Sequence, residues 1–387
     1  MAKELKRDHS EYRLEPEQLQ ILIDALQSGG YEVVGPTVKD QVIVYDRIQG
    51  VADLPVGLTG EQDRGRYRLE QRDDEAYFGY AVGPHSWKKY LFPPEQKLWE
   101  AYRNGKGFVQ NGDIPKPRKL AFLGVRPCEI HAIQIQDKVF TQGDYKDPFY
   151  SAQREIAFLV AVNCSFQGNN CFCASLNTGP GISGGCDLIL TEVFTGKQHY
   201  FVVQTGSRRG KKILEKISIQ VASAEERAAA AKTVAEAAVR MRKSLDTANL
   251  KEVLYANYEH PEWRRVAERC LSCGNCTMVC PTCFCSTVED VTDLKGEVAW
   301  RVRRWDSCFT LEHSYIHGGS IRTSAMSRYR QWLTHKLATW VDQFGVMGCV
   351  GCGRCITWCP VGIDLTQEAK VIQRDHLEKV SNPVKEN

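Results

Sequence analysis

Long apolar runs are missing from this sequence of 387 residues. The longest strongly apolar run, residues 156–162, is far shorter than the roughly 20 residues that a helix needs to cross a bilayer. The amino-terminal stretch MAKELKRDHSEYRLEPEQ is charged and lacks the apolar segment of a signal peptide. We therefore expect a cytoplasmic protein with no membrane insertion.

A strong excess of charge of one sign is also absent. The net charge of +3 is nearly neutral for a chain of this size, so neither nucleic acid nor an anionic membrane is indicated as a partner. The hydrophobic fraction of 43% and the charged fraction of 25% are ordinary for a globular protein with a sizeable core. The length itself predicts two or three domains.

Several common catalytic and nucleotide-binding motifs are missing as well. We find no nucleophile elbow, Walker-A loop or zinc-protease pattern. Gly179, Gly181 and Gly184 match G-x-G-x-x-G, but no strand leads directly into the segment and no helix follows it, so we predict a tight loop. His131 follows Cys128 without the preceding cysteine that covalent haem attachment requires. No catalytic residue is predicted.

Cysteine, by contrast, is abundant, with 16 residues. In a long chain without an export signal this number favours metal or redox work over disulfides. Two runs near the carboxyl end have the form Cys-x-x-Cys-x-x-Cys-x-x-x-Cys-Pro, which is known from bacterial ferredoxins. They comprise Cys270, Cys273, Cys276 and Cys280, then Cys349, Cys352, Cys355 and Cys359.

The spacing of these runs predicts two 4Fe-4S clusters. Three cysteines at intervals of three wrap one loop around three corners of a cubane, whereas the fourth points away and binds the cluster of the other run. Structural zinc is the alternative, although it prefers two separated C-x-x-C pairs. The predicted iron ligands are Cys270, Cys273, Cys276 and Cys359 for cluster 1, and Cys280, Cys349, Cys352 and Cys355 for cluster 2.

A further group of cysteines follows a predicted βαβ unit. Residues 119–125 and 156–162 are predicted buried strands, with a helix over residues 129–139 between them. The first two cysteines of the group follow these strands, at the sheet edge where ligands collect in α/β proteins. If the four thiols converge they suit a third cubane or a zinc ion, and otherwise they are buried free thiols. The group is Cys128, Cys164, Cys171 and Cys173.

Four cysteines remain outside these sets. Cys283, Cys285 and Cys308 lie close in sequence to the first run, but three thiolates bind a cubane only with a fourth ligand or an open iron. We therefore interpret them as buried residues beside the clusters. Cys186 is interpreted as a structural thiol.

The predicted elements define three parts of the chain. Residues 1–220 begin with a helix over residues 15–26 and continue in short strands, which indicates an α+β or α/β domain. Ser223 and Glu226 form a capping box at the start of a helix that continues to Leu245, within a helical bridge over residues 221–260. Residues 261–387 are predicted to form a mainly helical, ferredoxin-like domain, because a compact ferredoxin brings its second run much sooner.

Two stretches carry lysine or arginine in unusual number. Residues 83–94 combine aromatics with lysines and are interpreted as an amphipathic surface loop. The insertion between the two cysteine runs is basic, which would raise cluster potentials or dock an acidic partner, with a solvated helix face as the alternative. Its charged residues are Arg301, Arg303, Arg304, Arg322, Arg328, Arg330 and Lys336 against Asp306 and Glu312.

Five stretches together resemble one family. They resemble the beta subunit of cytoplasmic sulfhydrogenases, and the same set resembles the iron-sulfur subunit of anaerobic sulfite reductase. The stretches are GVRPCEIHAI (residues 124–133), NCSFQGNNCFCASLNTGP (163–180), CLSCGNCTMVCPTCFC (270–285), RRWDSC (303–308) and FGVMGCVGCGRCITWCPVGID (344–364).

The resemblance implies an electron-transfer subunit with at least two 4Fe-4S clusters and no substrate site of its own. Its implied partners are a subunit that binds FAD and NAD(P)H and a catalytic part, either the small and large subunits of a nickel-iron hydrogenase or a sirohaem sulfite reductase. We expect the hydrogenase version. The alternatives are the same relay in a sulfite reductase and a zinc-stabilised scaffold without redox work. The resemblance assigns no role to Cys186 and leaves a cluster on the amino-terminal cysteines open.

Overall fold

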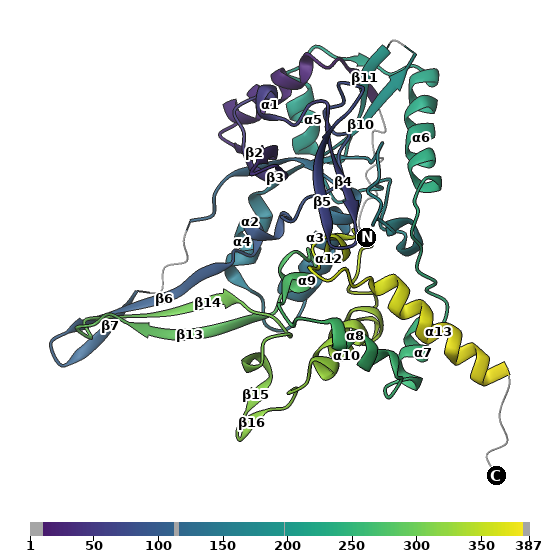
Figure 1. Cartoon of the computed structure of the whole chain (residues 1–387). Coiled ribbons are helices and arrows are strands. Elements are labelled where there is room, and N and C mark those ends of the chain that lie inside the picture. The colour runs from purple at the N-terminus through teal and green to yellow at the C-terminus, as the bar shows by residue number, and fades with distance from the viewer. Residues whose placement is uncertain (1–10, 112–115, 197, 382–387) are drawn as a thin grey trace, which may run out of the picture.

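The computed structural model describes residues 11–111, 116–196 and 198–381. It has an amino-terminal part built on a mixed α/β sheet and a carboxy-terminal part made largely of helices, as predicted (Figure 1). Within the described ranges, no helix is both long and apolar enough to cross a membrane.

An eight-stranded sheet organises the amino-terminal part. Its strands are β1 (Glu11–Leu14), β2 (Glu32–Lys39), β3 (Val42–Arg47), β8 (Leu120–Val125), β9 (Phe158–Val162), β10 (Leu188–Thr195), β11 (Gln198–Thr205) and β12 (Gln220–Val221). They lie in the order β12-β1-β11-β10-β9-β8-β2-β3. β2, β8, β9 and β10 run parallel in the middle, and the outer strands pair antiparallel.

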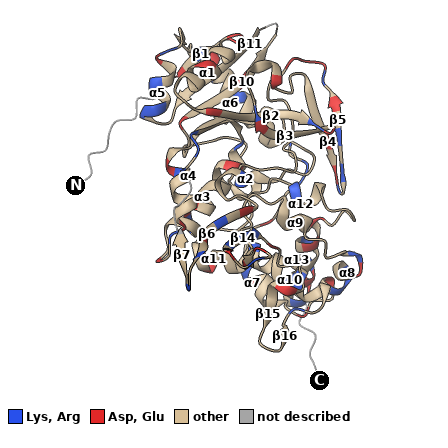
Figure 2. Cartoon of the chain, turned by 90° about the vertical axis from the view of Figure 1, so that its left-hand side faces the viewer, with Lys and Arg blue, Asp and Glu red and all other residues tan. Residues whose placement is uncertain are grey.

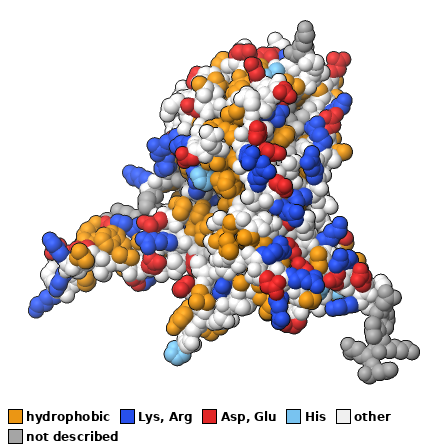
Figure 3. Space-filling view, viewed as in Figure 1, with side chains coloured by type: hydrophobic (Ala, Val, Ile, Leu, Met, Phe, Trp, Pro, Cys, Tyr) orange, Lys and Arg blue, Asp and Glu red, His pale blue; other side chains and the backbone are white. Residues whose placement is uncertain are grey.

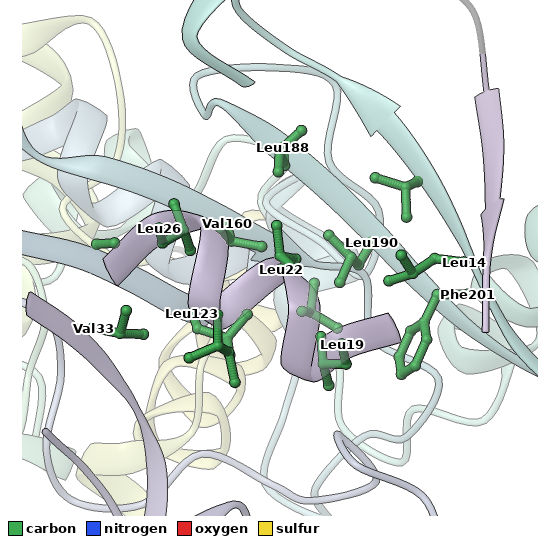
Figure 4. Packing of buried hydrophobic residues seen from close by; sticks show 14 of the residues in the cluster. Leu14, Leu19, Leu22, Leu26, Val33, Leu123, Val160, Leu188, Leu190 and Phe201 are labelled. Carbon is green, nitrogen blue, oxygen red and sulfur yellow. The ribbon is translucent and has the colours of Figure 1, made fainter. Parts of the chain in front are cut away.

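Helices cover both faces of this sheet. One face packs against α1 (Gln18–Ser28) and α5 (Arg208–Leu214), and the other against α3 (Pro127–Thr141) and α4 (Pro148–Ile156). Alternation along each strand separates the two sets, so that Leu123 faces α1 whereas Phe122 faces α3. Figure 4 shows Leu22 and Leu26 of α1 against the sheet side chains Leu123 and Val160. Each such leucine contributes roughly 1.5–3 kcal/mol by leaving water.

The predicted βαβ unit is confirmed. β8 and β9 are parallel neighbours, and α3 and α4 connect them. α3 begins two residues earlier than predicted because Pro127 occupies its first turn and the Glu129 carboxylate accepts a hydrogen bond from the Arg126 N–H at 3.2 Å. This start places Cys128 in the first turn of a helix at the carboxyl edge of the sheet.

The capping box is confirmed as well. Ser223 Oγ accepts from the Glu226 N–H at 3.2 Å, and the Glu226 carboxylate accepts from the Ser223 N–H at 2.7 Å. The helix that follows, α6 (Ala224–Val239), ends before the predicted Leu245 and packs on the sheet. The next helix, α7 (Leu250–Ala256), packs instead in the helical part.

The helical part surrounds the two cysteine runs. Its shared core contains Trp263, Leu333, Leu337 and Ile372. Its helices are α8 (Glu262–Arg269), α9 (Asn275–Met278), α10 (Ala325–Thr334), a π-helical turn (His335–Thr339), α11 (Trp340–Phe344), α12 (Arg354–Thr357) and α13 (Leu365–Ser381).

A second sheet joins the two parts. Its strands are β6 (Glu95–Asn104), β7 (Gly107–Asn111), β13 (Ser286–Thr292) and β14 (Val298–Trp305), in the order β13-β14-β6-β7. This sheet projects from the body, and hydrophobic side chains lie on its surface (Figures 1 and 3). Exposed examples are Tyr102, Phe108, Val109 and Val288. Shorter elements are β4 (Leu58–Asp63), β5 (Arg66–Gln71), β15 (Tyr315–Ile316), β16 (Gly319–Ser320), and 3-10 turns at Val51–Asp53, Cys173–Leu176 and Glu312–Ser314.

The interpretation of residues 83–94 as a surface loop is wrong. Trp87 and Phe92 are buried, and a short helix, α2 (Lys88–Leu91), lies between them. The Lys88 ammonium is itself buried, because it lies 3.8 Å from the centre of the Trp305 ring and donates to the Cys283 carbonyl at 3.1 Å. The segment therefore forms a packed joint between the sheet edge and the first cysteine run.

Candidate iron-sulfur centres

The two cysteine runs fold into the same backbone shape. Ser272 and Gly274 have φ angles of 51° and 75°, and Gly351 and Gly353 have φ angles of 63° and 74° at the equivalent positions. One short helix follows each loop, α9 in the first run and α12 in the second. Left-handed residues turn the chain tightly, as a loop around three corners of a small cluster requires.

Four thiols from both runs surround one cavity, here called the first group. Cys270, Cys273 and Cys276 of the first run line it together with Cys359 of the second. Burial raises the pKa of the Cys276 thiol, and the neighbouring thiols of Cys270 and Cys359 raise it further. Backbone N–H groups point at two of these sulfurs, from Ser272 to Cys270 at 3.4 Å and from Ile363 to Cys359 at 3.3 Å.

The remaining four thiols of the runs form the second group. Burial raises the pKa of Cys355, and the thiols of Cys349, Cys352 and Cys280 lie close enough to add to this effect. The Gly351 N–H lies 3.5 Å from the Cys349 sulfur and donates to it. The fold therefore places the last cysteine of each run with the first three of the other run.

A buried lysine contacts the second group. The Lys336 ammonium, which is 3% exposed, donates to the Cys280 sulfur at 3.1 Å, to Thr282 Oγ1 at 3.2 Å and to the Gly348 carbonyl at 3.2 Å. A hydrogen bond from Cys283, together with Lys336 and Thr282, holds the pKa of Cys280 well below its usual range against the effect of burial. Cys280 is thus set up as a thiolate beside a positive charge.

The four amino-terminal cysteines line one further cavity, here called the third group. Cys128, Cys164, Cys171 and Cys173 come together there. Burial raises the pKa of Cys171 to about 12, with the nearby Cys164 acting in the same direction. The segment with the G-x-G-x-x-G match is a loop, and a Cβ on Gly179 would lie only 2.9 Å from the Cys173 sulfur. That glycine is needed for the close approach of the loop to the thiol.

The wall of the third group also carries a buried cation. Arg126 is 1% exposed, and its Nη2 donates to the carbonyls of Phe78 and Tyr80 at 2.6 and 3.1 Å. Its Nε and Nη1 have no hydrogen-bond partner among the described residues. Burial raises the pKa of Cys164 and the guanidinium opposes this effect. A buried positive group with free N–H donors beside four thiols fits an anionic iron-sulfur cluster, since such donors need a partner.

The three groups adjoin one another through the second run. Cys355 also lines the cavity of the first group, and Cys352 also lines that of the third. The Phe172 N–H donates to the Gly351 carbonyl at 2.8 Å, which fixes the amino-terminal loop on the second run. The thiols therefore form a continuous row with the second group in the middle.

The cysteines outside the groups lie in different surroundings. Cys283 is buried beside Cys280, and Cys186 is a buried thiol whose pKa burial raises to about 12. Cys285 and Cys308 are only half-buried, at the start of β13 and just after β14. Among the described residues, no group of three or more His, Cys, Asp or Glu side chains has the geometry to hold a single metal ion.

The basic insertion contributes little free positive surface. Arg303 pairs with Asp147, Arg301 with Asp290 at 2.7 Å, and Arg330 with Glu259 at 2.9 Å. In the view of Figure 2, Lys and Arg are interspersed with Asp and Glu along the chain. Of the insertion's basic residues, Lys336 is the one that touches a candidate cluster ligand among the described contacts.

Sequence reasoning missed three buried cations, Arg126, Arg354 and Lys336. Arg126 stands two residues before Cys128, and Arg354 lies inside the second run. Their positions next to cysteines were visible signals. What the sequence does not display is that all three are buried, because their partners come from distant segments.

The comparisons with known proteins agree with this architecture. Residues 269–363 match the family model of the 4Fe-4S dicluster domain. The protein is therefore an iron-sulfur protein of the electron-transfer class, and the matched domain implies two 4Fe-4S clusters.

The family follows from a longer match. The chain is 33% identical over 303 residues to the sulfhydrogenase 2 subunit beta of Pyrococcus furiosus, covering 77% of this chain and 86% of that protein. It belongs to the sulfhydrogenase beta-subunit family. A serine palmitoyltransferase structure from S. paucimobilis matches at 12% identity over 58% of this chain and 57% of that one, and its TM-score of 0.15 carries no argument.

Proposed function

We propose that this subunit relays electrons between a partner that binds FAD and NAD(P)H and the catalytic part of a nickel-iron hydrogenase. The observation that carries the proposal is the continuous row of three thiol groups, because a relay needs carriers that adjoin one another. The family relationship supports the hydrogenase setting, since the relative in Pyrococcus furiosus is named as a sulfhydrogenase subunit.

We assign the ligands by group. Cys270, Cys273, Cys276 and Cys359 would hold one 4Fe-4S cluster, and Cys280, Cys349, Cys352 and Cys355 the other. When bound, these clusters supply one-electron steps. The chain's own part is to hold the thiolates in two crossed loops, to donate backbone N–H groups to the sulfurs, and to place Lys336 beside Cys280.

A third 4Fe-4S cluster is proposed on Cys128, Cys164, Cys171 and Cys173. Convergence of the four thiols on one cavity supports it, and so does the buried Arg126 with its two free N–H groups. A zinc ion on the same residues would satisfy the thiolates but would leave the relay one carrier shorter.

Iron counting tests the number of clusters. The chain purified without oxygen should contain about twelve irons, and the double variant Cys164→Ser/Cys171→Ser about eight. The matched control Cys186→Ser changes a buried thiol outside the three groups and should keep the full number. About eight irons in the unchanged chain would contradict the third cluster, and a colourless, iron-free chain would favour the zinc-stabilised scaffold.

Activity of the assembled complex tests the setting. Purified with its partner subunits, the protein should support hydrogen-dependent reduction of NAD or NADP, and Cys352→Ser should abolish this because Cys352 lies between two groups. The same control, Cys186→Ser, should leave the rate unchanged. Sulfite-dependent oxidation of NAD(P)H without any hydrogen-dependent activity would place the relay in a sulfite reductase instead.

A further inference from the structure

Two cysteines that the three groups leave unused meet at the base of the projecting sheet. Cys285 directly precedes β13, and Cys308 follows β14 by three residues. The ladder pairs Ser286 with Trp305, and the Asp306 N–H donates to the Cys285 carbonyl at 2.9 Å. The strand pairing thus brings both thiols to one place, where the Cys308 thiol donates a hydrogen bond to the Cys285 sulfur.

A histidine and an aspartate complete this cluster of side chains. His313 lies beside Cys285, and its Nδ1 is 2.6 Å from the Asp306 carboxylate. Asp306 is itself held by the Ser307 N–H at 2.6 Å. The hydrogen bond from Cys308 lowers the pKa of Cys285 to about 4 against burial, with His313 acting in the same direction, and Cys285 and Asp306 raise the pKa of His313 to about 9. Cys285 is therefore a thiolate beside a thiol, which is the reactive form for disulfide chemistry.

The pair adjoins the first group. Ser307 accepts a hydrogen bond from Thr277 Oγ1 at 2.7 Å, and Thr277 directly follows Cys276. Cys308 packs against the same apolar cluster as Cys270 and Cys276, and the Cys276 thiol lies close enough to influence it. Both cysteines of the pair are half-buried, so they are open to solvent on one side and near the candidate cluster on the other.

We propose that Cys285 and Cys308 are a redox-active dithiol that exchanges electrons with the adjoining iron-sulfur centre. The inference rests on the proposed function, because it needs a cluster in the first group. In the oxidising direction the Cys285 thiolate and the Cys308 thiol lose two electrons and one proton as the S–S bond forms. The electrons leave singly to one-electron iron-sulfur carriers, and the proton goes to solvent. Reduction reverses each step, so the dithiol stores a pair of electrons beside carriers that move one at a time.

Thiol labelling at controlled potential tests this proposal. The complete chain with its clusters is equilibrated without oxygen in dithiol buffers of graded potential, alkylated with N-ethylmaleimide, and read by peptide mass spectrometry. Cys285 and Cys308 should lose reactivity together and appear as one linked peptide. The ratio of disulfide to dithiol should change tenfold for about every 30 mV, the slope of a two-electron couple. Cys186→Ser is the matched control and should show the same transition.

Single variants separate a dithiol from other roles. Cys285→Ser should leave Cys308 open to alkylation at every potential, with the iron content of the chain unchanged. Loss of about four irons in Cys285→Ser or Cys308→Ser would show that these residues are cluster ligands and would overturn the proposal. Alkylation that does not depend on potential would also overturn it. Iron-free wild-type protein would remove the relay, and the electron exchange with it, even if the disulfide still formed.

Discussion

The guanidinium of Arg354 lies 2.5 Å from the carboxylate of Glu129, and neither side chain is more than 1% exposed. Arg354 belongs to the second cysteine run, whereas Glu129 stands in the first turn of α3 beside Cys128. Tyr45 and Trp87 donate to the other carboxylate oxygen at 2.8 and 2.9 Å. This buried pair fastens the second thiol group to the sheet edge that carries the third.

Breaking this pair should destabilise the protein strongly. Arg354→Met should lower the free energy of unfolding by about 3 kcal/mol or more, because removing one partner leaves the other charge buried and uncompensated. The control Arg301→Met removes an exposed pair with Asp290 and should cost about 1 kcal/mol or less. Urea unfolding followed by circular dichroism measures both. Equal losses in the two variants would contradict a structural role for the buried pair.

The crossed ligand assignment predicts which cluster each variant damages. Cys359→Ala should perturb the cluster held mainly by Cys270, Cys273 and Cys276, and Cys280→Ala should perturb the other one. Paramagnetic resonance of the reduced protein distinguishes the two signals. If each variant changed only the cluster of its own run, the assignment would be refuted.

Lys336 should raise the reduction potential of the cluster that includes Cys280. A positive charge 3.1 Å from a ligand sulfur stabilises the reduced, more negative state. Lys336→Met should therefore lower that potential by an amount on the order of 100 mV, from the Coulomb energy of adjacent charges in a protein environment. Redox titration followed by paramagnetic resonance measures it. Arg330→Met, which removes a charge paired with Glu259, is the control and should leave the potential in place.

Glu368 on α13 should make stability depend on pH. Burial and a hydrogen bond with Glu262 raise the pKa of its carboxyl group from 4.5 to about 7, against the ion pair with Arg269. Because the folded state holds this proton more tightly, the contribution is complete below about pH 4.5 and is lost as the pH rises through about 7.

The neutral variant Glu368→Gln tests that dependence. It should flatten the loss by an amount on the order of 1 kcal/mol after solvent screening. Urea midpoints at both ends of the pH window measure the difference. Glu378→Gln, at an exposed position on the same helix, should keep the wild-type slope. The same flattening in both variants would rule out Glu368 as the source.

Local patterns in the sequence predicted local structure well. The βαβ unit, the cap at Ser223 and the spacing of the two cysteine runs are all written in neighbouring residues. The projecting sheet could not be predicted, because it pairs Arg304 with Glu95 across more than half of the chain. Residues 83–94 failed for a related reason, since lysine normally marks the surface and the burial of Lys88 depends on the distant Trp305.

The candidate site divides in the same way. The cysteine spacing identified the groups of thiols, because ligand geometry imposes a regular interval on the sequence. The cations that tune those thiols leave no such interval. Arg126, Lys336 and Arg354 reach their thiol neighbours from three separate segments, and only the folded chain brings them there.

The projecting sheet also constrains how the protein is made. β14 lies between β13, its hairpin partner, and β6, which is synthesised long before it. The first part of the chain must therefore wait on the ribosome with an unpaired strand edge until the last third emerges. Iron delivery to the cysteine runs is then expected to come after translation, on a chain whose halves have already closed together. A ferredoxin-like fragment cut at residue 261 would lack that strand partner and would be a poor starting point for building the clusters separately.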